Sequence, residues 1–246
     1  MKIKNYQRDC FKNYKQDIGY PSEYSYLKGT PINVLVPIET TLNNIMIIGA
    51  YPSAKFYTIN GVPDTPMANN DYPFSNEKYF DGSRVRTIPS GKELNDIILD
   101  KIGVDRSECW VTNLVKVFLF KKGHIERYEK LGKTDLSENR TKFFEYAEKS
   151  MQWLDKEIEI CNPKVIILLG FEVTKVFFDL TDKKAKDYLN GYIKTKIING
   201  VKRNIICLPH PGILMRKTKK NPWPDKFDKH ISKIVKNKIK KLKKSK

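Results

Sequence analysis

Two short apolar segments, far apart in the chain, constrain the fold more than any other feature. Residues 45–49 read Ile-Met-Ile-Ile-Gly, and residues 204–209 read Asn-Ile-Ile-Cys-Leu-Pro. An apolar run closed by glycine or proline is typical of a strand buried in a parallel sheet. In open α/β sheets, ligands bind beyond the carboxyl ends of the strands. The sequence therefore predicts that residues 49–53 and 209–214 meet at one cleft.

Further apolar and amphipathic segments complete an alternation of strands and helices. We expect strands at 44–49, 108–117, 164–170 and 204–208, and helices at 90–99, 138–161 and 172–180. Ser90 and Glu93 have the spacing of a capping box. The dipeptide Asn199-Gly200 predicts a hairpin over residues 192–203. The element order predicts an α/β fold, a three-layer α/β/α sandwich around a central, mainly parallel four-stranded sheet.

The segments outside this pattern suggest three parts. They are an N-terminal helix and arm at 1–40, the α/β domain at 41–230 and a basic C-terminal helix or tail at 231–246. Inside the domain, residues 50–89 form a long connection, and connections of that length are usually functional. Residues 118–137 are predicted to be a charged loop. The C-terminal lysines fit either a solvated helix end or a tail that follows phosphates.

The charge favours a polyanionic partner. Lysine and arginine number 46 against 28 acidic residues, which gives a net charge of +18. An enzyme of small neutral metabolites has no need of such a field, whereas neutralising DNA phosphates releases counterions and drives binding. A lysine-rich, solvated surface is the plainer alternative. We expect nucleic acid as the partner.

Cysteine usage and hydropathy predict the compartment. The cysteines are Cys10, Cys109, Cys161 and Cys207. They form no C-x-x-C pair and read as reduced core residues of an intracellular protein. The N-terminus has no apolar signal region, and the longest apolar stretch, residues 165–171, is too short to span a bilayer. We therefore expect a soluble, cytoplasmic monomer without membrane contact.

Four short motifs follow one another along the chain. They are the Gly-x-x-Pro turn at 49–52, a strand ending in Asn113, a strand ending in Gly170, and His-Pro followed by Leu214 at 210–214. In this order they resemble the motifs of the uracil-DNA glycosylase superfamily. Residues 90–94 are similar to the family's Ala-Gly-x-x-Leu helix. The resemblance covers roughly residues 44–216. It implies a monofunctional DNA glycosylase that flips out uracil or a modified pyrimidine and hydrolyses its N-glycosidic bond, leaving an abasic site.

The resemblance is closest to a branch that often carries an iron–sulfur cluster, but the cluster cysteines are missing. Val117 stands where that branch has a cysteine, and its N-terminal cysteine pair is reduced to Cys10. A cluster needs four thiolates, so we expect no cofactor and no metal. Many members carry an acidic or amide residue in the Gly-x-x-Pro turn to position the attacking water. Here Ala50 and Tyr51 occupy these places, which leaves water activation open.

The resemblance implies the groups that hold the base. His210 would donate to the oxygen of the leaving base, Asn113 would read its Watson–Crick edge, and Phe74 would stack on it. Gly49 and Ala50 would complete the base pocket. The plainer alternatives are a capping histidine at a strand end, an asparagine that ends a strand, and an aromatic ring packed in the core.

The other predicted site residues serve catalysis or DNA binding. With His210, the predicted catalytic residues are Tyr51, which would wall off a base with a bulky 5-substituent, and Asp71, an acidic candidate for the water together with Asp64. Leu214 would fill the gap that the base leaves, unless it is a plain loop leucine. The remaining predicted DNA contacts are Pro52, Ser53, Gly212, Arg216 and Lys217.

Two alternative functions stay open beside uracil excision. One is a modified-cytosine glycosylase that acts in defence against viral DNA, with the pocket reshaped by Tyr51 and an insertion at 75–89. The other is a non-catalytic nucleic-acid binder of the same fold. A nucleotide-handling Rossmann-like enzyme is disfavoured, because no Gly-x-Gly-x-x-Gly or P-loop run follows a strand.

Overall fold

A computed structural model describes residues 2–27, 29–59, 62–69, 71–75, 78–80 and 84–244. Its centre is a sheet with the strand order β6-β1-β7-β9-β8. The strands are β6 (Cys109–Asn113), β1 (Ile45–Gly49), β7 (Val165–Leu169), β9 (Val201–Leu208) and β8 (Ile193–Ile198). The first four run parallel, and β8 pairs with β9 in the antiparallel sense. Every residue of β1, β6 and β7 is buried, as strands covered on both faces require.

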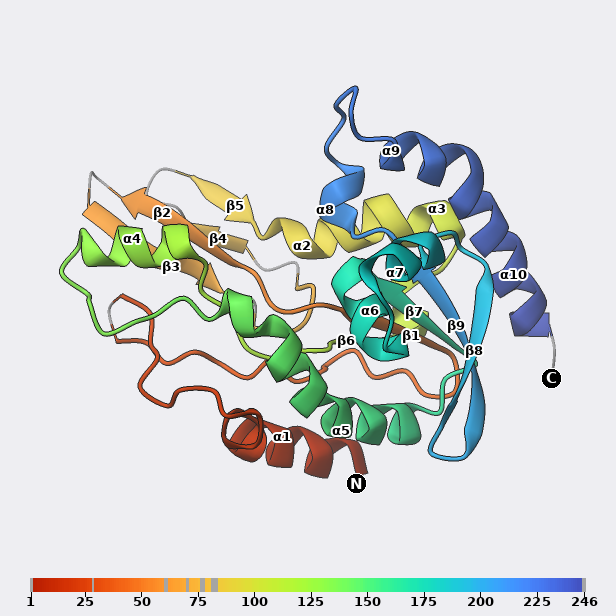
Figure 1. Ribbon diagram of the computed structural model, residues 1–246, viewed down its shortest axis with the longest axis horizontal. Helices are drawn as coiled ribbons and strands as arrows, with labels where there is room; N and C mark the ends of the chain where they lie inside the picture. Colours follow the sequence, from red (N-terminus) through yellow and green to blue (C-terminus); the bar gives the residue numbers. More distant parts are fainter. Residues whose placement is uncertain are drawn as a thin grey trace.

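Helices cover both faces of this sheet (Figure 1). On one face lie α1 (Lys2–Ile18), α5 (Phe143–Cys161), α6 (Phe171–Phe178) and α7 (Asp182–Tyr188). On the other lie α2 (Pro89–Lys92), η1 (Glu93–Leu99), α3 (Asp100–Ile102), α8 (Pro211–Leu214), α9 (Trp223–Lys226), η4 (Phe227–Ile231) and α10 (Ser232–Lys244). The two faces form separate apolar clusters, because successive strand residues point to opposite sides. The α/β sandwich is thereby confirmed.

The sheet differs from the prediction in its strand count. Within the described residues it has five strands rather than four. The predicted hairpin exists, and Asn199 and Gly200 both have positive φ angles, of 50° and 75°, as a tight hairpin turn requires. Its second arm continues without a break into the expected strand at 204–208, so that β8 becomes an additional edge strand of the main sheet.

Two predicted loops contain regular structure. The connection at 50–89 holds two hairpins, β2 (Ala54–Ile59) with β3 (Val62–Asn69) and β4 (Lys78–Phe80) with β5 (Val85–Thr87). Part of the predicted insertion, at residues 76–77 and 81–83, lies outside the described residues. The predicted charged loop at 118–137 contains α4 (Lys122–Glu129), and the preceding residues 114–120 are buried. Short 3-10 turns at η2 (Arg106–Glu108) and η3 (Arg140–Lys142) precede β6 and α5.

The basic C-terminal segment is a packed helix in the structure. Val235 and Ile239 of α10 are buried in the cluster that also contains η1 and α3. The lysines of this segment therefore belong to a helix that packs against the domain through its apolar side. In the part of the chain that the structure describes, no helix has the length and apolar character needed to cross a bilayer.

Candidate active site

A cleft of about 180 Å³ opens at the carboxyl ends of β1 and β6. Its lining residues are Ala50, Tyr51, Pro52, Ser53, Phe74, Pro89, Ser90, Glu93, Asn113 and His210. Sites for drug-sized ligands are typically about 300–1,000 Å³, so this cleft suits a single small ring. The two distant segments that the sequence predicts to converge do meet here, through residues 50–53 and His210.

Gly49 brings the two sides of the cleft together by lacking a side chain. It is paired in register with Asn113 at the end of the sheet. A Cβ atom on Gly49 would lie 2.5 Å from Asn113 Oδ1 and 2.6 Å from the Phe74 ring. Only glycine therefore lets the carboxamide and the ring close over the strand end.

The peptide that follows Asn113 extends the pairing beyond the strands. Leu114 N donates to Gly49 O over 2.8 Å, and Val115 N donates to Ala50 O over 2.9 Å. These bonds tie the turn after β1 to the end of β6. Asn113 is thus held by backbone contacts on the side that faces β1, with only 2% of its surface exposed.

Phe74 is held in an uncommon backbone conformation. Its φ angle is 54°, which for a residue other than glycine costs on the order of 1–3 kcal/mol. Arg106 fixes it by donating from Nη2 to Phe74 O over 2.7 Å, and the same guanidinium forms a two-point pair with Glu39 at 2.6 and 2.8 Å. Strain that the surroundings hold in place is often found at ligand-binding positions.

His210 has two nitrogens with different partners. Its Nδ1 accepts a hydrogen bond from Gly212 N over 3.0 Å and so caps α8. In the neutral ring the proton is then on Nε2, which leaves one N–H donor for the cleft that His210 lines. His210 is an exposed residue, but the protein packed around its ring partly desolvates it and lowers its pKa; Glu172 opposes this shift and Arg216 adds to it. The capping role and the donor role are therefore compatible.

Tyr51, in the wall of the cleft, is held by Arg140, which in turn pairs with Glu172; the sequence patterns single out neither residue. Arg140 Nε donates to Tyr51 Oη over 2.7 Å, and the guanidinium lies 4.5 Å from the centre of the Tyr51 ring. Arg140 Nη2 also pairs with Glu172 Oε1 at 3.1 Å. Glu172, at the start of α6, is thus linked to Tyr51 through Arg140 and to His210 through its charge.

One predicted catalytic residue, Asp71, is exposed and does not line the cleft. The side chain of Asp64 lies outside the described part of the structure. Leu214, predicted to fill the gap that the base leaves, is 5% exposed in this structure and packs in the apolar cluster beside η1. Its neighbours Ile213 and Met215, 36% and 49% exposed, are the apolar side chains that face solvent.

Of the residues predicted to contact DNA, Pro52 and Ser53 line the cleft. Gly212 is in α8, next to the cap formed by His210. Arg216 and Lys217 are exposed directly after this helix.

Glu93 lines the cleft, whereas the sequence pattern predicts for it a role in capping a helix. The predicted capping box would have used Ser90 and Glu93, but α2 begins earlier, after Ile88, and no side chain caps it. Glu93 is half-buried and instead contributes a carboxylate to the cleft. Its proximity to the cleft depends on how the connection at 50–89 folds, which the local spacing does not reveal.

The residues present do not fit an iron–sulfur cluster. The cysteines at 10, 109, 161 and 207 are buried, in α1, β6, α5 and β9. Burial raises the pKa of each thiol to about 12, which disfavours the thiolate that a cluster binds. In the described part of the chain, no group of three or more His, Cys, Asp or Glu side chains is arranged to hold a metal ion.

Comparison with known proteins agrees with the motifs and the fold. Residues 39–237 match the family model described as the Uracil DNA glycosylase superfamily. A search of curated proteins finds no significant match. The family match includes β1, β6, β7, β9 and every residue that lines the cleft. This chain belongs to the uracil-DNA glycosylase superfamily.

Proposed function

We propose that this protein is a monofunctional DNA glycosylase that flips uracil, or a related altered pyrimidine, out of DNA and hydrolyses its N-glycosidic bond. The observation that carries the proposal is the meeting of Asn113, His210 and Phe74 in one cleft of about 180 Å³. Among the described residues that line this cleft there is no lysine to form a Schiff base with the sugar. This favours attack by water over a covalent lyase mechanism.

The base would be held by stacking and by its polar edge. Phe74 offers a ring face, and the Asn113 carboxamide offers one acceptor and two donor hydrogens to a Watson–Crick edge. As the bond to the sugar breaks, negative charge develops on a pyrimidine oxygen. The His210 Nε2–H is a preorganised donor for this oxygen, and one such donor typically contributes about 3 kcal/mol to the transition state. The lowered pKa of His210 keeps the imidazole neutral, so it donates without adding a positive charge.

Glu93 is our candidate for holding the attacking water. The turn after Gly49 carries Ala50 and Tyr51, neither of which offers a carboxylate, whereas Glu93 lines the same cleft from η1. A carboxylate there would accept a proton from the water and stabilise the cationic sugar. DNA phosphates near the sugar would add to this field.

Contacts outside the base pocket would supply most of the affinity. The net charge of +18 favours the phosphate backbone, with Arg216 and Lys217 near the cleft on the exposed loop after α8. Ile213 and Met215 are the exposed apolar side chains of this region. In place of the buried Leu214, they would fill the gap that the flipped base leaves in the DNA. Pro52, Ser53 and Gly212 would contact the flanking backbone. We further propose that the enzyme acts as a cytoplasmic monomer.

The test is a panel of oligonucleotides that differ only in one base, incubated with the protein and then cleaved with hot alkali. We expect strand breaks at uracil. Breaks at 5-hydroxymethylcytosine and not at uracil would favour a second candidate, excision of modified cytosine in viral DNA. The clamped Tyr51 ring in the cleft wall is the observation that keeps this candidate open. DNA binding without any abasic product would favour a non-catalytic binder.

The role of Glu93 has its own test. Glu93→Gln should lower the single-turnover excision rate by roughly 10²–10⁴, the range typical of a lost general base. Asp96→Asn is the matched control, since Asp96 is on the same helical segment, pairs with Lys92 and does not line the cleft. If Asp71→Asn abolished excision and Glu93→Gln did not, the water would belong to Asp71.

A further inference from the structure

A fully buried ion pair lies behind Asn113, and the proposed chemistry does not use it. Lys116 Nζ is 2.7 Å from Glu157 Oε1, and neither side chain has any exposed surface. The same ammonium group donates to Thr112 Oγ1 over 2.9 Å and to Asn113 O over 3.0 Å. All three donor hydrogens of Lys116 therefore have acceptors. Because buried ion pairs often contribute little net stability, the contacts of this pair point to another role.

The carboxylate of this pair is held from two other elements. Tyr6 Oη, on α1, donates to Glu157 Oε1 over 2.6 Å, and Trp110 Nε1, on β6, donates to Oε2 over 3.2 Å. Burial and the negative charge of Glu157 raise the pKa of Tyr6 well above its ordinary value, so the phenol remains a donor. Glu157 thus connects the N-terminal helix to the strand that ends in Asn113.

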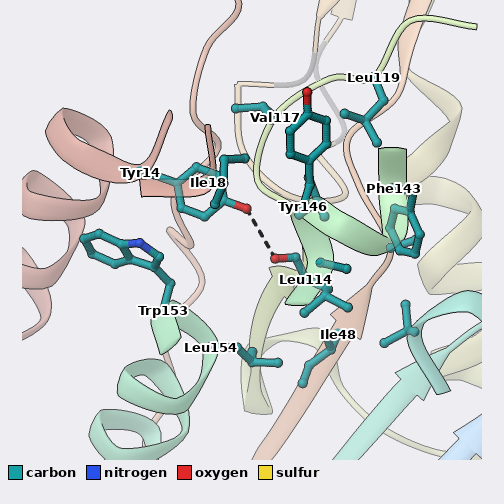
Figure 2. Packing of buried hydrophobic residues seen from close by; sticks show 14 of the residues in the cluster. Tyr14, Ile18, Ile48, Leu114, Val117, Leu119, Phe143, Tyr146, Trp153 and Leu154 are labelled. Atoms are coloured by element: carbon teal, nitrogen blue, oxygen red, sulfur yellow. Dashed lines mark hydrogen bonds between the residues drawn. The ribbon is translucent and has the colours of Figure 1, made fainter. Parts of the chain in front are cut away.

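The N-terminal segment, residues 2–38, also holds the chain that follows Asn113. Tyr14 Oη accepts from Lys116 N over 2.9 Å and shares a hydrogen bond with Ser150 Oγ at 2.5 Å. Tyr14 points toward Leu114 across the cluster shown in Figure 2. Farther along, Leu35 N donates to Lys116 O over 2.8 Å. This segment lies outside the family match at 39–237.

The geometry fixes one peptide group in particular. The carbonyl oxygen of the Asn113–Leu114 peptide accepts from Lys116, and its N–H donates to Gly49 O over 2.8 Å. Both polar ends of the peptide are therefore held, from opposite sides. Because this peptide sets the direction of the Asn113 side chain, the Lys116 contact bears on how the carboxamide meets a base.

We propose that the N-terminal segment is a positioning element for base recognition: through Tyr14 and the Lys116–Glu157 pair it sets the carboxamide of Asn113 in the cleft. The role of Asn113 toward the base rests on the proposed function. Tyr14 and Lys116 touch no substrate and act through Asn113. A displacement of about 1 Å at a reacting centre can cost up to 10²-fold in rate, so a modest loss of support has a measurable effect.

Tyr14→Phe in the full-length chain tests this proposal with little risk to folding. Tyr24→Phe is a matched control, because Tyr24 Oη also accepts from a backbone N–H, that of Ser137 at 3.0 Å, and belongs to the same N-terminal segment. With a uracil oligonucleotide in single turnover, Tyr14→Phe should lower the excision rate roughly tenfold with a DNA dissociation constant within about twofold of wild type. Tyr24→Phe should leave both values unchanged.

A second readout does not depend on activity. The side-chain amide resonance of Asn113, assigned with Asn113→Asp, should shift in Tyr14→Phe and in Lys116→Met but not in Tyr24→Phe. If Tyr14→Phe and Tyr24→Phe gave the same rate and left the Asn113 resonance in place, the positioning proposal would be overturned. A wild-type protein that excises no base would instead remove the proposed function, while the resonance would still decide whether the N-terminal segment positions Asn113.

Discussion

The two faces of the central sheet are packed with different chemistry. The face toward η1, α3 and α10 is an apolar cluster of Ile, Leu, Val, Phe and one Cys. The face toward α1 and α5 contains buried polar side chains among its aromatic rings, including Lys116, Glu157, Tyr6 and Tyr14. Apolar packing tolerates small changes of shape, whereas a hydrogen-bonded network fixes the direction of each group in it.

The polar face of the sheet lies next to Asn113, and this location indicates a role in the geometry of the cleft. Its charged pair contacts the peptide after Asn113, whereas the apolar face supports the sheet from the side of α3 and α10. We infer that one face mainly stabilises the fold and the other also sets the geometry of the cleft. Substitutions on the two faces should therefore differ in how stability and activity change together.

The largest expected effect comes from breaking the buried pair. Lys116→Met leaves the Glu157 carboxylate buried without its counter-charge, which typically costs about 3–5 kcal/mol. Adding Glu157→Gln removes the unpaired charge, so the double variant should be more stable than the sum of the single effects by about 1–3 kcal/mol. Urea unfolding of the four proteins measures this coupling. If the losses in unfolding free energy of the two single variants simply added in the double variant, Lys116 and Glu157 would not be energetically coupled.

On the apolar face, Ile102→Ala should reduce stability without changing the chemistry. Ile102 is fully buried on α3 and does not line the cleft, so the substitution should cost about 2–5 kcal/mol. The excision rate per folded molecule should stay within about twofold of wild type. The comparison between the faces fails if this variant loses as much single-turnover rate as Tyr14→Phe.

A smaller effect concerns the pH dependence of excision. The neutral form of His210 both caps α8 and offers Nε2–H, and its pKa lies below the ordinary value of about 6.5. The rate should therefore hold as the pH falls to 6.5 and decline only at lower pH, where Nδ1 becomes protonated. Glu172 raises this pKa, so Glu172→Gln should move the decline to still lower pH. A decline that starts above pH 7 would show that another group limits the rate.

Much of the fold and of the cleft was predictable because the ends of strands have local sequence signals. Gly49, Pro209 and the hairpin dipeptide at Asn199 mark the ends of apolar runs. The parallel strand order then brings the carboxyl ends of the strands to one edge of the sheet. The Lys116–Glu157 pair also has a sequence signal, since each charged residue stands in an otherwise apolar pattern. Glu157 falls on the apolar stripe of α5, and Lys116 interrupts an otherwise apolar run at 114–120.

Other features depend on information that local patterns lack. Whether Leu214 faces inward depends on where α8 begins, because each helical residue turns by about 100° and neighbouring residues therefore face different directions. Glu93 and Arg140 reach the site region only through long-range packing of segments that follow irregular connections. The dipeptide Asn-Gly at positions 60–61 is a sequence signal for a hairpin, and the segments on either side of it pair as β2 and β3. The whole segment 50–89 was predicted to be one connection, without this hairpin.

The central claim is that Asn113 and His210 act together on one extruded pyrimidine. Its most direct measurement is single-turnover excision of uracil from an oligonucleotide by the wild type, Asn113→Ala and His210→Ala. We predict alkali-labile sites with the wild type, and rates lower by roughly 10²–10³ in His210→Ala, as for other lost oxyanion donors, with similar DNA binding. Equal rates in the wild type and both variants would contradict the account.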